Sequence, residues 1–312
     1  MGVHRFKKGL NLPIAGEPEQ IIASGVSGTT VAVVAADYVG MKPTMFVREG
    51  DTVKLGQPLF EDKKSVGTIY TSPAAGTVAA VNRGDKRALQ SVVITLSSSE
   101  RQGKISEDEI VSFDSYQQKD VVSYSRDEVR ALLIESGLWT AFRTRPFSKV
   151  PSVESEPASI FINAMDTNPL AASVDVIYAE NQEAFEKGLA AIAKLREGNI
   201  YLCTAENSKV NVGPYAGIAH EQFAGPHPAG TSGVHIHTLR PAHPGRVAWT
   251  IGYQDVIAIG KLIKTGRLDV TRVISLAGPQ VNKPRLVRTR IGASIDALVE
   301  GELKHGENRI IS

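Results

Sequence analysis

Histidines are the side chains of this sequence whose number and spacing could do chemistry. Five of the seven fall in or beside residues 225–260: His220, His227, His235, His237 and His243. Glycine and proline crowd the same stretch, and both disfavour a helix or a plain strand, because glycine loosens the backbone and proline lacks an N–H donor. We therefore expect a shaped segment that serves a metal, an anion, an aromatic ring or a partner surface.

A zinc site is the first chemistry that these histidines suggest. On a strand, His235 and His237 would point to the same face, and His227 on the preceding loop could be a third ligand. No acidic ligand lies at motif spacing, so we predict no metal site. Two other roles stay open: hydrogen-bonded structural histidines, and histidines that line a ligand or partner surface.

A quinone is the ligand that we consider for such a surface. Its head group fits an apolar cleft with one or two hydrogen-bond donors at the carbonyl oxygens. The side chains that could line a quinone or partner surface are Phe223, His227, His235, His237, Trp249 and Tyr253.

Nucleophilic catalysis has no candidate residue. The single cysteine, Cys203, lies in the apolar run 200–204, which predicts a small core residue. No Gly-x-Ser-x-Gly elbow, Walker loop or His-Glu-x-x-His sequence is present. Arg143, Arg145 and Lys149 could clamp an anion or an acidic neighbour, or could be ordinary exposed charges. We predict no catalytic residue in this chain.

Predicted strands and helices alternate in the middle of the chain, and these elements position the residues named above. Ser125 and Glu128 form a capping box, which predicts a helix over 126–136 that ends at Gly137. Beyond it, the patterns predict a buried strand, a helix and a second strand, at 159–164, 184–195 and 200–204. Strand, helix and strand in this order indicate a βαβ unit and a parallel sheet.

The loop after the first of these strands bears on nucleotide binding. A pyrophosphate needs closely spaced glycines between a strand and a helix N-terminus. Residues 164–171 contain no glycine, so we predict no nucleotide there. Asp166 and Asn168 in this loop are interpreted as turn and cap residues.

The first third of the chain predicts a small β-sandwich, because short β-rich runs alternate with turn signals from Thr30 to Leu96. Its Val-x-x-Gly-Asp-x-Val-x-x-Gly-Gln-x-Leu run resembles the biotinyl/lipoyl carrier fold, whose modified lysine lies on a following hairpin. Lys63 lies near that position, but extra residues before Ser72 displace it from the hairpin tip. We expect the fold without its prosthetic group, and keep a lipoyl- or biotinyl-type carrier as an alternative.

The C-terminal part predicts two strands from Arg272 onward and a short helix over 294–300, which suggests a β-grasp module. Basic residues gather here and just before it: Lys261, Lys264, Arg267, Arg272, Lys283, Arg285, Arg288 and Arg290. This basic face is either solvated surface or a docking face for an acidic partner or the edge of a membrane complex. We expect the natural chain to continue beyond residue 312.

Composition sets the broad class. The chain has 312 residues, of which 42% are hydrophobic and 22% charged, as in a globular protein of two or three domains. No apolar run reaches the roughly 18 to 20 residues that span a bilayer, and the N-terminus lacks the apolar core of a signal peptide. With a net charge of +2, the sequence indicates neither nucleic-acid nor membrane binding by itself. We expect a soluble, cytoplasmic chain.

Seven blocks of sequence resemble the NqrA family, the A subunits of the bacterial sodium-translocating NADH:quinone oxidoreductases: residues 8–16, 138–151, 165–171, 225–230, 235–237, 253–258 and 282–289. This resemblance implies a peripheral subunit on the cytoplasmic face of the inner membrane, in a complex of six subunits. The complex oxidises NADH, reduces ubiquinone or menaquinone and pumps sodium outward. As a whole it uses flavins and an iron–sulfur cluster besides NADH and ubiquinone.

The family is in turn similar to the C subunit of the Rnf electron-transport complex and to the flavin-carrying subunit of respiratory complex I. These relatives imply an α/β multidomain fold: an N-terminal segment (1–30), a carrier-like barrel-sandwich domain (31–97), a Rossmann-like α/β domain (98–257) and a β-grasp, soluble-ligand-binding module (258–312).

The sequence also departs from these relatives. The loop 138–146 lacks the glycine cluster that holds FMN in the complex I subunit, and the cysteine motif that ligates iron–sulfur clusters in the Rnf subunit is absent. We therefore expect a cofactor-free chain with a structural or quinone-proximal role, which is not catalytic in isolation. A flavin-binding subunit and a direct quinone-binding module are the alternatives.

Overall fold

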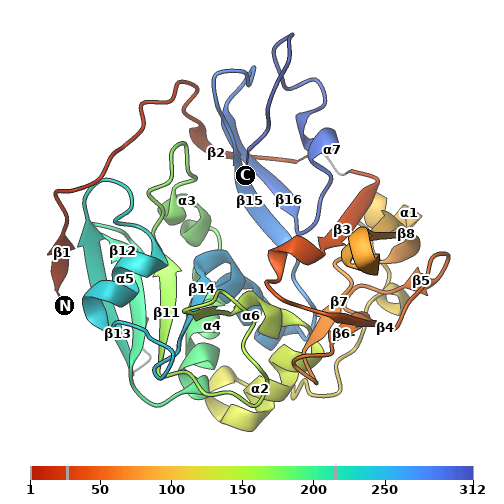
Figure 1. The fold of residues 1–312 in the computed structure, drawn as a ribbon, viewed down its shortest axis with the longest axis horizontal. Helices are drawn as coiled ribbons and strands as arrows, with labels where there is room; N and C mark the ends of the chain where they lie inside the picture. The colour runs from red at the N-terminus through yellow and green to blue at the C-terminus, as the bar shows by residue number, and fades with distance from the viewer. Residues whose placement is uncertain (1, 26–27, 214–216, 312) are drawn as a thin grey trace.

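Short runs of β-branched and aromatic residues form a six-stranded sheet in an α/β domain (Figure 1). The computed structural model describes residues 2–25, 28–213 and 217–311. In spatial order the strands are β1 (Val3–Arg5), β13 (Ile218–Ala224), β12 (Ile200–Ala205), β11 (Ser159–Ala164), β14 (Ala248–Gly252) and β10 (Arg143–Arg145). All neighbours are parallel except β10, which runs antiparallel to β14. The predicted strands at 159–164 and 200–204 and their parallel pairing are confirmed.

Helices cover both faces of this sheet. One face carries α2 (Arg126–Glu135), α3 (Val174–Ala179), α4 (Gln182–Leu195) and α6 (Tyr253–Thr265). The capping box of Ser125 and Glu128 is present, which confirms the predicted start of α2. Gly188 of α4 and Gly260 of α6 let the two helix backbones touch, since a Cβ on either glycine would overlap a carbonyl oxygen of the other helix. The predicted boundary at 257/258 falls within α6, whose buried side packs on α4.

The opposite face carries α5 (Ser232–Leu239), and here a prediction is wrong. Residues 235–237 were expected on a strand or shaped loop, but they lie in a helix. Four of the glycines and prolines, at 225, 226, 228 and 230, precede Thr231, the N-cap residue with an extended backbone, and the helix itself contains only Gly233. Burial of His235 and Ile236 against the sheet stabilises a segment of low intrinsic helix propensity, because tertiary packing outweighs propensity in short helices.

A β-sandwich follows the N-terminal segment, as predicted. One sheet contains β3 (Thr30–Val34), β9 (Leu89–Leu96), β8 (Gly76–Arg83) and β5 (Thr52–Val53). The other contains β4 (Pro43–Met45), β6 (Pro58–Asp62) and β7 (Ile69–Thr71). Alternate side chains such as Val92 and Ile94 point inward and meet Leu59 and Phe60 in a separate core. The short helix α1 (Ser98–Arg101) leads away from it.

A third, three-stranded sheet stands above the other two domains in Figure 1. β15 (Thr271–Leu276) pairs antiparallel with β16 (Arg285–Arg290), and the short helix α7 (Ile295–Val299) follows, as predicted. Its third strand is β2 (Glu19–Ala23), which pairs parallel with β16. The N-terminal segment therefore gives one strand to the α/β sheet and one to this sheet. Neither strand was foreseen, because both are short and largely exposed. No helix within the described ranges is long and apolar enough to cross a membrane.

Candidate functional site

His235 is a buried structural residue on the α5 side of the sheet. Its ring lies 4.1 Å from that of Phe223 on β13, and His4 of β1 packs on the same phenyl ring at 4.9 Å between centroids. Nε2 donates to the carbonyl oxygen of Ala229 at 2.9 Å, whereas the buried Nδ1 has no partner among the described residues. Burial lowers the pKa of His235 to about 4, so the ring is neutral near pH 7.

The other two histidines of the predicted set lie apart from His235. His227 is in the loop before α5, where Nδ1 lies 3.1 Å from the hydroxyl of Thr167. That hydroxyl also accepts from the N–H of Gly230 at 3.0 Å, which holds the loop in place. His237 is exposed, because two residues along a helix rotate a side chain to the other side. The strand geometry expected for His235 and His237 is therefore wrong, and no metal-binding group of three His, Cys, Asp or Glu is found among the described residues.

Trp249 and Tyr253 face the other side of the sheet. Trp249 is buried against Trp139 and Phe142, with ring centroids at 5.2 and 5.7 Å. Tyr253 begins α6, and burial raises its pKa to about 12. Adjacent strand residues point to opposite faces, so Trp249 cannot share a cavity with Phe223 and His235. The six predicted residues therefore do not meet at one cavity, and Trp249 is the one that lines the interdomain cleft described below.

The N-terminus of α6 would be the natural place for a phosphate in such a sheet. Its first turn instead carries Asp255, whose carboxylate pairs with Arg272 at 2.5 Å. A carboxylate at this position repels an anion, and β14 runs directly into α6 through Gly252 without an intervening loop. The chemistry of this end of the sheet therefore does not fit a dinucleotide.

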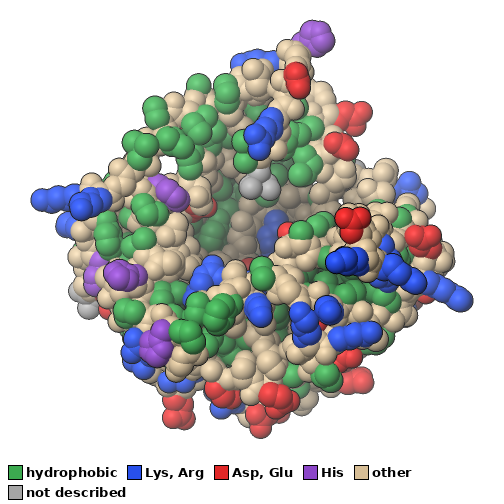
Figure 2. Space-filling view, viewed as in Figure 1, with side chains coloured by type: hydrophobic (Ala, Val, Ile, Leu, Met, Phe, Trp, Pro, Cys, Tyr) green, Lys and Arg blue, Asp and Glu red, His purple; other side chains and the backbone are tan. Residues whose placement is uncertain are grey.

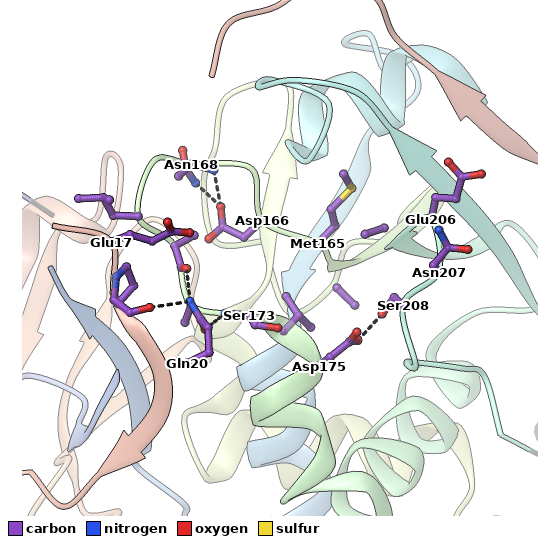
Figure 3. Close-up of a pocket in the computed structure, with 17 residues that line it drawn as sticks. Glu17, Gln20, Met165, Asp166, Asn168, Ser173, Asp175, Glu206, Asn207 and Ser208 are labelled. Carbon is purple, nitrogen blue, oxygen red and sulfur yellow. Dashed lines mark hydrogen bonds between the residues drawn. The ribbon is translucent and has the colours of Figure 1, made fainter. Parts of the chain in front are cut away.

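A first cleft, the strand-end cleft, lies at the carboxyl ends of β11 and β12 and has a volume of about 430 Å³ (Figure 3). The N-terminal segment closes one side through Gln20, whose side chain accepts from the N–H of Ser173 at 2.7 Å. The acidic side chains on its walls are Glu17, Asp166, Asp175 and Glu206. This cleft is polar and acidic, which suits neither a quinone nor a phosphate.

A second cleft, the interdomain cleft, lies between the β-sandwich and the α/β domain and has a volume of about 350 Å³. Its lining is mainly apolar: Tyr38, Met41 and Tyr70 come from the sandwich, and Phe147, Val150 and Trp249 from the α/β domain. Apolar clefts with a few polar groups are the usual form of small-molecule sites.

Two buried donors line the interdomain cleft. The Tyr70 hydroxyl and the Trp249 indole N–H make no hydrogen bond within the described part of the chain. Burial raises the pKa of Tyr70, so its hydroxyl stays protonated and able to donate. Tyr70 is fixed by stacking on Phe60 and by an edge contact with Tyr38, each with centroids 4.7 Å apart. An unpaired buried donor costs about 1–3 kcal/mol, which an acceptor on a ligand would recover.

Cations stand around this cleft. Lys64 and Lys149 line it, and the guanidinium of Arg143 lies over the Tyr38 ring at 5.2 Å. Burial and the neighbouring Arg143 lower the pKa of Arg145, which bonds the hydroxyl of Ser148 at 2.9 Å. Of the three cations that we singled out in the sequence, Lys149 lines the cleft and Arg143 contacts one of its lining residues, and the acids Asp62 and Glu156 also line it.

Lys63 lies in the turn between β6 and β7, next to the interdomain cleft. The turn is tightly bonded: Asp62 accepts from the N–H groups of Lys42 and Lys64, both at 3.0 Å, and the Lys63 N–H donates to the Lys42 carbonyl. A Cβ on Gly67 would contact Val153 of the α/β domain at 3.1 Å. The hairpin is thus docked on its neighbour, whereas a swinging arm needs a free tip.

The basic run of the C-terminal part is largely neutralised. Its cations pair with acids elsewhere in the chain: Lys261 with Asp269, Lys264 with Glu183, Arg267 with Glu107, Arg272 with Asp255, Arg285 with Glu302, Arg288 with Glu180 and Arg290 with Glu100. Because each of these cations has a carboxylate partner within the chain, most of the positive charge of this segment is compensated.

Tyr70 and Tyr38 are the functional candidates that the sequence did not reveal. Both lie in the β-sandwich, and their sequence context indicates ordinary aromatic residues of a core. Their role depends on Trp249, which comes from another domain, and no local pattern connects them.

Three domain-family models match consecutive parts of the chain. Residues 4–97 match the NqrA N-terminal barrel-sandwich hybrid domain, residues 124–268 the NqrA second alpha/beta domain, and residues 273–312 the NQRA C-terminal domain. Together they cover most of the sequence.

Curated relatives match almost the whole chain. The A subunit of the Na(+)-translocating NADH-quinone reductase of Pasteurella multocida is 54% identical over 307 residues, which are 98% of this chain and 67% of the relative. Those of Glaesserella parasuis and Cellvibrio japonicus are each 53% identical, over 98% and 99% of this chain and 67% of the relatives. The chain spans about two thirds of their length. Among solved structures, an NAD+-reducing [NiFe]-hydrogenase in the air-oxidised state aligns with 63% of this chain and 42% of its own chain, at 14% identity and a TM-score of 0.43, too weak to support an argument.

Proposed function

Because the chain belongs to the NqrA family, the A subunits of the Na+-translocating NADH-quinone reductases, we propose that it is a peripheral subunit of a complex that couples NADH oxidation and ubiquinone reduction to sodium export. It works at the cytoplasmic face of the bacterial inner membrane, bound to the other subunits of that complex. The observation that carries this proposal is the identity of above 50% over nearly the full chain.

Co-purification tests the proposal. The chain, tagged at an exposed loop and expressed in its native host, should be recovered from membranes in mild detergent together with a sodium-stimulated NADH:quinone reductase activity. Recovery of the chain free of other subunits and of this activity would contradict the proposal.

Within that complex we propose a scaffold without a bound redox cofactor. Asp255 at the start of α6 and the glycine-free loop after β11 support this, because both oppose a dinucleotide or flavin phosphate at the end of the sheet. The purified chain should show no flavin absorbance near about 450 nm. Stoichiometric flavin would overturn this part of the proposal.

We also propose the finer fold assignments. The strand order, with β12 and β13 on one side of β11 and β14 on the other, supports a Rossmann-like α/β domain. The β15–β16 hairpin and α7 support a β-grasp module, and both support kinship with the Rnf and complex I subunits. Since α6 packs on α4, we place the boundary between these two units near residue 270 rather than at 257/258.

Direct contact with quinone is a second function that one observation favours. The interdomain cleft is mainly apolar, and two of its lining residues, Tyr70 and Trp249, each carry a buried donor without a partner among the described residues. A small movement of these side chains would offer one donor to each of the two carbonyl oxygens of a quinone. Of the six residues predicted for a quinone surface, Trp249 is the one at this cleft. Phe223 and His235 instead fill a core on the far side of the sheet.

Intrinsic fluorescence reports directly on this cleft, because Trp249 lines it and the second tryptophan, Trp139, touches Trp249. A short-chain ubiquinone should quench the emission saturably. The Tyr70→Phe variant should bind about five- to tenfold more weakly, since one hydrogen bond is worth roughly 1 kcal/mol. The Tyr253→Phe variant, at a residue that does not line the cleft, should bind as the unmodified chain does. Equal affinity in all three proteins would rule out the cleft.

A further inference from the structure

The N-terminal segment exposes three apolar side chains in succession. Leu10, Leu12 and Ile14 are 64%, 51% and 42% exposed, and together they form what we call the apolar ridge. Figure 2 shows hydrophobic side chains along the upper rim of the molecule, where this segment passes from β1 to β2 in Figure 1. Contiguous exposed apolar side chains of this kind mark interaction sites rather than ordinary surface.

The apolar ridge is held in place at both ends. The N–H of Leu10 donates to the carbonyl oxygen of His227 at 2.9 Å, and the N–H of His227 donates to Asn11 Oδ1 at 3.0 Å. At the other end, the N–H of Gly278 donates to the carbonyl of Gly16 at 2.9 Å. The positive φ of Gly16, +83°, brings its backbone so close to Gly278 that no side chain would fit. The exposure is therefore a fixed feature of the fold and not the fraying of a terminus.

A groove of about 400 Å³ runs beside the ridge. Its apolar wall residues are Leu12, Pro13 and Ile14 on one side and Pro169 and Leu170 of the loop after β11 on the other, and Asn11, Thr167 and Asn168 add polar groups. Leu170 has a φ of +59°, a conformation that costs a non-glycine residue about 1–2 kcal/mol. Strain of this kind is concentrated at functional sites, and here it places an apolar side chain on the groove wall.

The groove continues into the acidic strand-end cleft, and Glu17, Asn168 and Leu170 line both. Neither Glu17 nor Asp166 forms an ion pair with any cation of the described residues. Carboxylates without counter-ions beside an apolar ridge repel anionic lipid head groups and attract a cationic partner. Lys7 and Lys8 precede the ridge, which makes a membrane surface the competing occupant.

We propose that the apolar ridge and groove, with the adjoining acidic cleft, bind an extended segment of a membrane-embedded partner subunit that combines apolar residues with Lys and Arg. This inference rests on the proposed function. Cytoplasmic segments next to transmembrane helices are rich in Lys and Arg, which gives such a partner the required chemistry. Its apolar side chains fill the groove against Leu12 and Leu170, and its cations meet Glu17 and Asp166.

Photo-cross-linking in the intact complex tests the occupant. A benzophenone amino acid replaces Leu12 in the full-length subunit, and replaces the exposed Val122 of the α/β domain as the matched control. Irradiation should link position 12, and not position 122, to a Lys- and Arg-rich segment next to a transmembrane helix. A product on lipid only, on a segment without basic residues, or no product in an assembled complex would overturn the proposal.

Substitutions test the chemistry separately. Glu17→Lys with Asp166→Lys should lower the recovery of this subunit with the complex in moderate salt by about tenfold, as expected for reversed charges at a docking site. Glu154→Lys with Glu300→Lys, at exposed acids elsewhere, should leave recovery unchanged. Equal loss in both pairs would attribute the effect to net charge and overturn the specific site.

Vesicles separate the lipid from the protein partner. The purified full-length subunit should sediment with phosphatidylethanolamine–phosphatidylglycerol vesicles no better than a Leu10→Ser, Leu12→Ser, Ile14→Ser variant does. Strong sedimentation that the triple variant loses would assign the ridge to the membrane and overturn the proposal. Failure of the unmodified subunit to co-purify with any complex would instead refute the proposed function itself, so the two failures are distinguishable.

Discussion

Protonation of His235 should destabilise this fold at mildly acidic pH. In the folded chain the ring is fully buried, its Nε2 donates to Ala229, and Nδ1 has no acceptor within the described residues that could stabilise a second proton. The folded pKa of about 4 lies below the ordinary value of 6.5, so the unfolded chain binds the proton more tightly. Its contribution to stability is complete above about pH 6.5 and is lost as the pH falls toward 4.

The size of the effect follows from that difference in pKa. A difference of 2.5 units amounts to about 3 kcal/mol in total, and about 2 kcal/mol is lost by pH 5. The replacement His235→Leu removes the titrating group and leaves the Ala229 carbonyl without its donor. We expect that variant to be about 1–2 kcal/mol less stable at pH 7.5, but to lose less stability on acidification than the unmodified chain does.

Urea unfolding at pH 7.5, 6 and 5, followed by circular dichroism, measures these free energies. The matched control is His237→Leu, on the same helix but exposed, which should keep the pH dependence of the unmodified chain. If His235→Leu and His237→Leu lose stability in parallel between pH 7.5 and 5, the reasoning from burial is refuted.

Three further substitutions test packing and polar contacts. Gly260→Ala would drive a Cβ into the carbonyl oxygen of Ala184, so we expect a loss of at least about 3 kcal/mol in the free energy of unfolding, measured by urea denaturation. Arg290→Met leaves the buried carboxylate of Glu100 without its cation, which should cost about 3 kcal/mol at pH 7, as measured by urea denaturation. Tyr70→Phe removes a buried hydroxyl without a partner among the described residues and should leave stability unchanged or raise it by about 1 kcal/mol, whereas a marked loss would mean that the hydroxyl is bonded.

Elements with local signals could be predicted from the sequence. Ser125 and Glu128 define the start of α2 within one turn, and the apolar run at 159–164 is a buried parallel strand because both its faces are covered by helices. Short exposed strands such as β1 and β2 carry no such signal, since their register is set by partners far along the chain.

The candidate site was predictable only in part, because its residues also come together through contacts between distant parts of the chain. Trp249 was singled out, but the cleft that it lines requires Tyr70 from another domain. The histidine cluster misled because His235 and His237 lie on a helix, where two residues apart means opposite sides. The helix forms there because its residues are buried against Phe223. The local sequence of the segment carries no signal of that contact.

The pairing of β1 and β2 has a consequence for how the chain is made. Both strands are synthesised before the rest of the chain. β1 can pair only after β13 has been made, and β2 only after β16, which ends at Arg290. At translation rates of about 5–20 residues per second, the nascent segment spends on the order of ten seconds or more with unpaired edges and exposed Leu10, Leu12 and Ile14. The β-sandwich can fold earlier, because all its strands lie within residues 30–96. Nascent chains should therefore recruit chaperones through their first residues until β16 has emerged from the ribosome, and ribosome-bound chains halted before β16 should remain sensitive to proteolysis at the N-terminus.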